Sequence, residues 1–228
     1  ALPKAGGTMT GNLATAGISA VTAGTSNFVA GVNAGNSIVS GGDYNTVVGD
    51  NAGTAITTGD NNVAVGYNSL IANTTASANT ALGDNSLRDN TTGASNTAVG
   101  HASLLNNTTA SNNTAVGYYS LLANTTGTRN TAVGKDAGKS ITTASENTVV
   151  GCLAGDAITT GTKNNFFGDS AGTSVTTGNY NVAIGNAALS SATTASDNTA
   201  VGQAALTSNT TGTLNTATGS QSLDANTT

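Results

Sequence analysis

The chain has 228 residues, a formal net charge of −5, and only 7% charged and 4% aromatic residues. It contains no basic stripe, which argues against a nucleic-acid interface, and no apolar run approaches the ~18 residues that cross a bilayer. The single cysteine, Cys152, excludes an intrachain disulfide, and the single proline with a regular register argues against disorder.

Residues 1–26 are expected to form an N-terminal connector, in which residues 2–13 read Leu-Pro-Lys-Ala-Gly-Gly-Thr-Met-Thr-Gly-Asn-Leu. Residues 27–44 are expected to form an irregular first coil, because the unit Asn-Phe-Val-Ala-Gly at 27–31 lies eighteen residues before the next similar unit. Regular coils are expected over 45–228. We expect the natural protein to continue past residue 228, since the sequence stops inside a repeat.

From residue 45 the sequence repeats every seventeen residues without a slip. A glycine, numbered position 0, closes a short β-prone run in every unit: Gly49, Gly66, Gly83, Gly100, Gly117, Gly134, Gly151, Gly168, Gly185, Gly202 and Gly219. An asparagine stands at position −4 of every unit: Asn45, Asn62, Asn79, Asn96, Asn113, Asn130, Asn147, Asn164, Asn181, Asn198 and Asn215. A strict short period indicates units that stack on copies of themselves. The sequence therefore predicts an all-β fold, a parallel β-solenoid (β-roll or β-helix) of 17-residue coils.

The run at positions −4 to −1, such as 113–116, predicts one short strand per coil. The glycine is expected to form a tight corner with positive φ, and the asparagine amides are expected to form a hydrogen-bonded ladder. Strand alternation places Thr114 and Val116 on one face and Ala115 on the other. Neither face carries a charge in any copy, so we expect both faces to be covered.

Two kinds of coil alternate irregularly along the chain. Where position +4 is leucine, as at Leu121, position +7 is asparagine or alanine; where position +4 is glycine, as at Gly138, position +7 is isoleucine or valine. We interpret this exchange as two ways of filling one core space. A Thr-Thr pair at +8 and +9, from Thr57-Thr58 onward, predicts a second corner.

Charges define the outside of the coil, because they occur only at positions +1, +2, +5, +6, +11 and +12 of the repeats. The charge-free positions −4 to 0, +3, +4 and +7 to +10 are expected to form the interior or a subunit contact. A sparse aromatic column at +1 and +2 is a possible surface contact: Tyr67, His101, Tyr118 and Tyr119.

Catalysis needs convergent acids, bases or nucleophiles, and one histidine with one cysteine supplies neither a catalytic set nor a zinc site. We therefore expect no enzymatic activity, no cofactor and no metal. The Asn-Thr-Thr strings at 73, 90, 107, 124, 209 and 226 match the glycosylation sequon, but we interpret them as a by-product of the repeat.

The unit Asn-Thr-Ala-Val-Gly-Tyr-Tyr-Ser-Leu at 113–121 resembles the head repeats of trimeric autotransporter adhesins, and the likeness extends over 27–228. It implies a left-handed β-roll assembled as a parallel homotrimeric fibre. The segment 2–13 resembles the Leu-Pro-x-x-Gly-Gly-Thr-Met-Thr-Gly segment of bacteriophage tail-fibre proteins, in which it commonly precedes trimeric shafts.

Together the resemblances predict the shaft of a phage tail fibre, located on the virion outside the cell, that spaces a receptor-binding tip. The implied partners are two further copies of the chain, other virion tail components, and a host-surface glycan or protein receptor bound outside this sequence. Nucleic acid and membrane insertion are not expected. The alternatives are a bacterial surface adhesin and, from another class, an ice-binding solenoid that uses the outward threonines.

Overall fold

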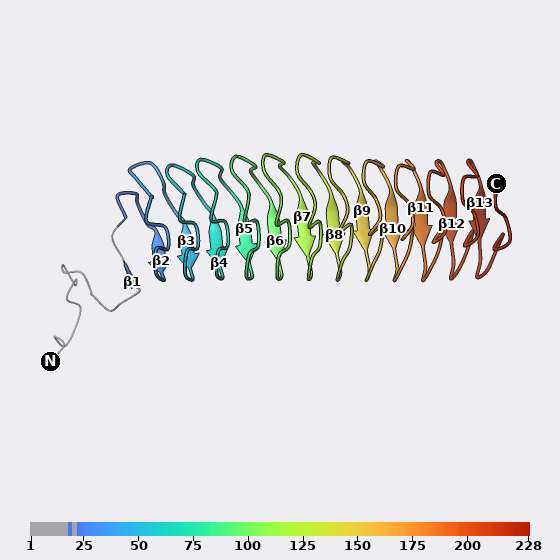
Figure 1. The fold of residues 1–228 in the computed structure, drawn as a ribbon, viewed down its shortest axis with the longest axis horizontal. Helices are drawn as coiled ribbons and strands as arrows, with labels where there is room; N and C mark the ends of the chain where they lie inside the picture. The colour runs from blue at the N-terminus through green and yellow to red at the C-terminus, as the bar shows by residue number, and fades with distance from the viewer. Residues whose placement is uncertain (1–17, 20–21) are drawn as a thin grey trace.

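The computed structural model describes residues 18–19 and 22–228. This part of the chain forms thirteen strands in one sheet, in the order of the sequence, and has no helix. Strand β1 pairs antiparallel with β2, and every later neighbour pairs in parallel, from β2–β3 to β12–β13. The strands lie side by side along a rod, with β1 at one end and β13 at the other (Figure 1). The predicted all-β parallel solenoid is confirmed.

Apart from β1, each strand is three residues long. The strands are β1 (Ile18–Ser19), β2 (Phe28–Ala30), β3 (Thr46–Val48), β4 (Val63–Val65), β5 (Thr80–Leu82), β6 (Thr97–Val99), β7 (Thr114–Val116), β8 (Thr131–Val133), β9 (Thr148–Val150), β10 (Asn165–Phe167), β11 (Val182–Ile184), β12 (Thr199–Val201) and β13 (Thr216–Thr218). Equivalent residues pair seventeen apart, as Thr114 does with Thr131. The first step is eighteen residues, since Phe28 pairs with Thr46.

The loops stack in register as well as the strands. Leu70 N–H donates to Ser86 O at 3.0 Å, and Thr57 N–H donates to Thr74 O at 2.8 Å, so corners of neighbouring coils bond to each other. These bonds pair backbone groups that short strands alone would leave unsatisfied. The strict sequence period therefore reflects hydrogen bonding around much of the coil.

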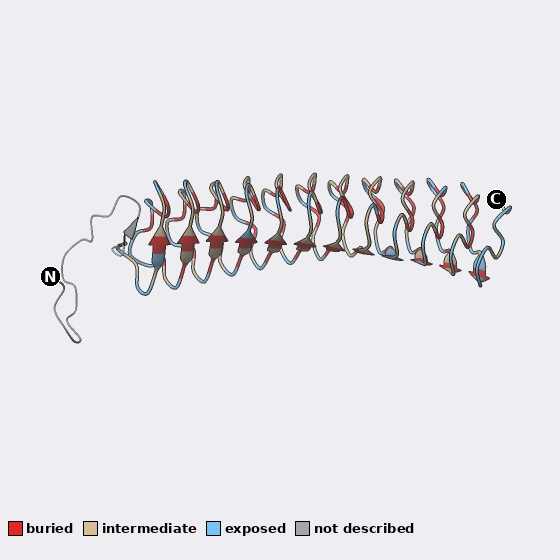
Figure 2. Ribbon diagram, turned by 90° about the horizontal axis from the view of Figure 1, so that it is seen from below, coloured by how far each residue is buried: buried red, intermediate tan, exposed pale blue. Residues whose placement is uncertain are grey.

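The core is a column of small and medium side chains inside the coils. The middle residue of each strand is buried, as Ala115 is with 0% exposure, whereas Thr114 and Val116 on either side are half-exposed. Figure 2 shows buried, intermediate and exposed segments following one another along the coils. A single chain therefore covers one strand face, and the coverage of both faces that the sequence predicts requires a partner on the other face.

Each coil turns through left-handed backbone at three positions besides the corner glycine. In one coil these are Tyr119 with φ 57°, Leu121 with φ 48° and Arg129 with φ 58°, and the same three positions have positive φ in other coils. Left-handed backbone costs an L-residue about 1–2 kcal/mol. The sequence predicted only the glycine corner, because the residues at these positions vary from copy to copy.

The expected boundary at residue 26 falls just before β2. The tail-fibre-like segment 2–13 lies outside the described residues. The left-handed coil and the trimer implied by the resemblance remain predictions.

Candidate functional site

The asparagines at position −4 form a continuous buried column. Asn62 Oδ1 accepts the backbone N–H of Asn79 at 3.0 Å, and Asn62 Nδ2 donates to Ala76 O at 2.9 Å. Asn62 Nδ2 also donates to Asn45 Oδ1 at 3.1 Å. The amide-to-amide bond occurs at some steps only, whereas the bond from amide oxygen to the next backbone N–H is present from Asn27–Asn45 to Asn198–Asn215. Each side chain thus ties two successive coils together.

A second asparagine column lies at position +7, and the sequence reasoning missed it. Asn90 Nδ2 donates to Asn73 Oδ1 at 3.0 Å, Asn107 Nδ2 donates to Asn90 Oδ1 at 2.8 Å, and Asn124 Nδ2 donates to Asn107 Oδ1 at 2.9 Å. All four side chains are fully buried. The available signal was the recurrence of asparagine at a charge-free position. Burial excludes these sequons as glycosylation sites on the folded chain.

The corner glycines pack directly against the next coil. A Cβ on Gly117 would lie 2.4 Å from Gly134 O, and the Gly117 φ of 136° is one that L-residues rarely adopt. Only glycine fits where two backbones approach this closely. These glycines are structural and present no ligand-binding loop.

The two kinds of coil fill the same space. A Cβ on Gly53 would lie 2.8 Å from Ile56 Cδ1 and 3.2 Å from Val47 Cγ1. The isoleucine at +7 therefore occupies the volume that a leucine at +4 takes in other coils. Position −2 takes part too, because it is alanine in every leucine coil and holds Val47, Val149 or Phe166 only in glycine coils.

The Thr-Thr corner presents one exposed threonine file. The first threonine of a pair bonds to the next coil; for example, the Thr91 hydroxyl donates to Thr108 O at 3.0 Å. The second threonine is exposed, as at Thr92. The corner therefore supplies a single outward file and not a flat face.

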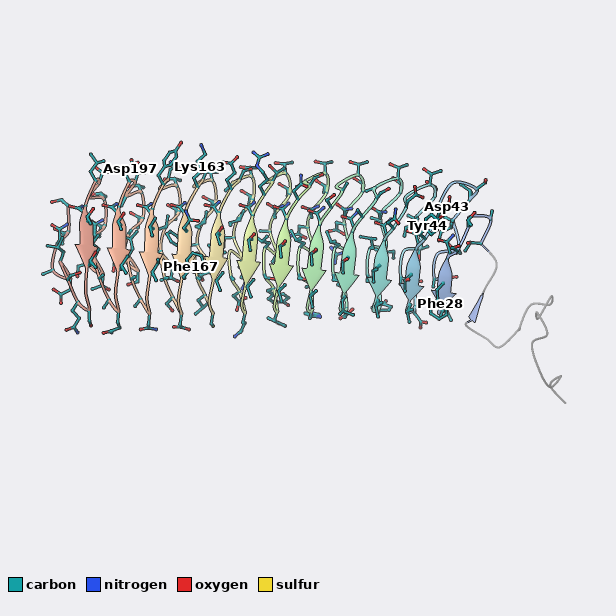
Figure 3. The ribbon with its side chains drawn as sticks, turned by 180° about the vertical axis from the view of Figure 1, so that it is seen from behind. Phe28, Asp43, Tyr44, Lys163, Phe167 and Asp197 are labelled. Carbon is teal, nitrogen blue, oxygen red and sulfur yellow. The ribbon has the colours of Figure 1, made fainter. Side chains whose placement is uncertain are left out.

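The outer strand face is a regular surface that runs along the rod. Position −3 is mostly threonine and position −1 is mostly valine, and neither is charged in any coil. Its bulkier members are well exposed: Leu82 by 45%, Phe167 by 39% and Ile184 by 42%. Figure 3 shows Phe167 in the row of strands, whereas Lys163 and Asp197 lie along a separate edge.

The edge at position +12 carries a column of charges. Arg129 pairs with Glu146, and Lys163 Nζ lies 3.9 Å from Glu146 and 3.2 Å from the Tyr180 hydroxyl. The hydrogen bond from Arg129 lowers the pKa of Glu146, and the hydrogen bond with Tyr180 raises the pKa of Lys163. These groups are solvent-exposed, so the column is a solvated face with little influence on stability.

Three of the four aromatic-column residues come together. His101 stacks on Tyr118 with ring centroids 5.4 Å apart, and Tyr118 lies 3.9 Å from Tyr119. A hydrogen bond with Tyr119 raises the pKa of the Tyr118 hydroxyl. Tyr67 makes no aromatic contact with any other described residue.

The described part of the chain holds no group of three or more His, Cys, Asp or Glu that could bind a metal ion. Residues 18–19 and 22–228 contain no helix, and so no helix that could cross a membrane. A cavity of about 290 Å³ at the first coil is lined by uncharged residues such as Asn33 and Ile38. Cys152 is a free, half-buried thiol.

Comparison with protein-family models, with curated proteins and with solved structures gives no significant match for this chain. Functional interpretation therefore depends on the surfaces described above.

Proposed function

We propose that this chain is the shaft of a viral tail fibre: a rigid, parallel homotrimeric spacer that holds a receptor-binding tip away from the virion. The opening segment at 2–13 supports a viral origin, and the long regular rod supports a spacer. The same coil could serve a bacterial surface adhesin, but the opening segment favours the virus.

The observation that carries the proposal is the uncharged outer strand face. Positions −3 and −1 are half-exposed or exposed along the rod, yet charges are confined to other columns. The −1 file of this face is Val, Leu, Phe or Ile in every regular coil except the last, and soluble monomers rarely expose a contiguous apolar strip of this length. Such a face is best explained by a partner that covers it.

A second copy of the chain suits this face because it has the same rise per coil. Any partner that covers every coil must repeat with the strand spacing of about 4.8 Å, and a parallel copy in register does so automatically. Cyclic symmetry closes the assembly without leaving the same face open on the last copy. Three copies around one axis would form a fibre with charged edges outside.

Sedimentation equilibrium of the purified chain tests the proposal. The expected mass is three times the chain mass of 21.9 kDa. Replacing Val116 and Val133 on the strand face with lysine should yield folded monomers, because buried unpaired charges oppose the contact. The matched control, Asn186→Lys on an exposed corner, should remain trimeric. A monomeric wild-type chain would refute the homotrimeric fibre.

Ice binding is the second candidate function, and one observation favours it. The strand face presents two parallel files, mostly threonine at −3 and mostly valine at −1, on an in-register parallel sheet. The threonine corner lacks that second file. Because ice and a trimer would need the same face, thermal hysteresis from a monomeric wild-type chain would support ice binding, and its absence would remove this candidate.

A further inference from the structure

One part of the rod departs from the repeat at an exposed edge. Positions +1 and +2 hold Asp, Asn, Ser, Gln or Ala in most coils, but the chain's single histidine and its only adjacent tyrosine pair occupy them in successive coils. His101, Tyr118 and Tyr119 form one aromatic cluster, with centroids 5.4 Å, 5.6 Å and 3.9 Å apart. The fold does not require aromatic residues there, since coils with Gln203 and Ala204 at these positions stack equally well.

Positively and negatively charged side chains lie beside the cluster. His101 Nδ1 lies 3.0 Å from Asp84 Oδ2, and Lys139 Nζ lies 5.5 Å from the centre of the Tyr119 ring. Asp136 is nearly buried, and its Oδ1 lies 3.3 Å from Lys139 Nζ without forming a hydrogen bond of good geometry. Carboxylate acceptors, an ammonium donor and aromatic ring faces are thus close together on neighbouring coils.

The cluster is open to solvent. Tyr118 is 45% exposed, and His101 and Lys135 are exposed as well. Position +1 carries charges in other coils, so this edge lies outside the strand face proposed as the subunit contact. Each chain would carry a complete copy of the cluster whether it is monomeric or trimeric.

We propose that the cluster around His101, Tyr118 and Tyr119 is a shallow binding site for a neutral glycan. An aromatic ring can pack against the C–H face of a pyranose, and the Asp84 carboxylate and Lys139 ammonium can accept from and donate to sugar hydroxyls. Asp84 and Asp136 are balanced by Lys135 and Lys139, so the site has no net positive charge that would favour polyanions such as nucleic acid or sulfated glycans. This activity goes beyond the proposed spacer function and does not depend on it.

An array of neutral hexose and N-acetylhexosamine oligosaccharides, with sulfated and sialylated members included, provides the first probe. The wild-type chain is expected to bind a subset of the neutral members. Titration of the best member can then follow tyrosine fluorescence, because the chain contains no tryptophan. Binding to no array member, or to the sulfated and sialylated members only, would overturn the proposal.

Matched tyrosine variants locate the site. Tyr118→Ala should weaken binding by about tenfold, which corresponds to about 1.4 kcal/mol and lies within the range for loss of a stacked ring. The control Tyr67→Ala removes an equally exposed tyrosine of the same column and should leave the affinity within about twofold of wild type. Equal affinities of wild type and Tyr118→Ala, or equal losses in both variants, would refute the assignment. Sedimentation of each variant measures its oligomeric state, so that a change in assembly can be told apart from a loss of glycan binding.

Discussion

A Cβ built on Gly117 would lie 2.4 Å from the carbonyl oxygen of Gly134, the same corner of the next coil. A Cβ built on Gly138 would lie 3.0 Å from Ile141 Cδ1, which is the end of a flexible side chain. The two glycines also differ in backbone, with φ of 136° at Gly117 and 56° at Gly138. Leucine adopts the second conformation at the equivalent position of other coils. Glycine is therefore required at position 117 because a side chain would meet the backbone of the next coil. At position 138 glycine is only favoured, because its left-handed backbone is open to other residues at some cost.

We expect Gly117→Ala to lower the free energy of unfolding by about 3 kcal/mol or more, because the next backbone must move and the φ is strained. Gly138→Ala, the control, should cost less, about 1–2 kcal/mol, because alanine takes left-handed backbone there and only side-chain ends such as Ile141 Cδ1 have to move by a few tenths of an ångström. Both sites lie in the middle of the rod, so end fraying affects neither. Chemical denaturation followed by circular dichroism provides the comparison, and equal losses would show that the corner contact is not limiting.

At the scale of the coil, three positions share one core volume. Leucine at +4 accompanies alanine at −2 and a small or amide residue at +7, whereas glycine at +4 admits Ile141 or Ile158 at +7. The buried Phe166 shows how far this exchange extends, because a Cβ on Gly172 would lie 2.3 Å from its ring. The coil tolerates different side chains as long as their summed volume fills the space.

A double-mutant cycle tests this sharing where the two kinds of coil meet. Leu121→Gly should cost about 3 kcal/mol, the loss of a buried leucine partly offset by relief of its left-handed backbone. Asn124→Ile alone should cost about 1–3 kcal/mol by overpacking. The double variant should cost only about 1 kcal/mol, well below the sum of the two single losses, which corresponds to a coupling of about 3 kcal/mol or more in urea unfolding. Additive effects would show that the two sites do not share a space.

Asn124 suits the exchange because it ends the second asparagine column. Its Oδ1 already lacks a partner, and Gly127 O would keep its bond from Asn113 Nδ2 at 2.8 Å. The control is Leu87→Gly with Asn90→Ile in the middle of that column, where Asn90 bonds to Asn73 and Asn107. An isoleucine there breaks two amide bonds, so the recovery should be smaller.

Features carried by a repeated residue type were predictable from the sequence, whereas backbone conformations adopted by varying residues and single side-chain contacts were not. The stacked strands, the −4 asparagines and the +4/+7 exchange follow from period and volume. Left-handed backbone at Arg129 or Tyr119 was not predictable, because such residues carry no preference for it. The His101–Tyr118 stack depends on side-chain directions at a non-repeating site, so the sequence indicated only an aromatic column.

For the whole molecule, stability is expected to come from contacts between neighbouring coils, because each strand of the described residues pairs only with the strands next to it in the sequence. A complete repeat should therefore be removable at little cost. Deletion of Asn186–Gly202 joins Gly185 to Gln203 and preserves the position of every later residue in the coil. The Leu206 coil would then follow the Gly172 coil, as the Leu189 coil does now.

We expect this seventeen-residue deletion to shorten the rod by about 4.8 Å, one strand spacing, while the melting temperature changes little. Small-angle X-ray scattering gives the length, and circular dichroism gives the melting curve. Deletion of Asn186–Thr193 alone removes fewer residues, but it leaves a coil too short to close and shifts every later residue out of register. Strands β12 and β13 should then lose their pairing and melt early. Equal melting temperatures for the two deletion variants would show that the register between coils does not determine the stability of the rod.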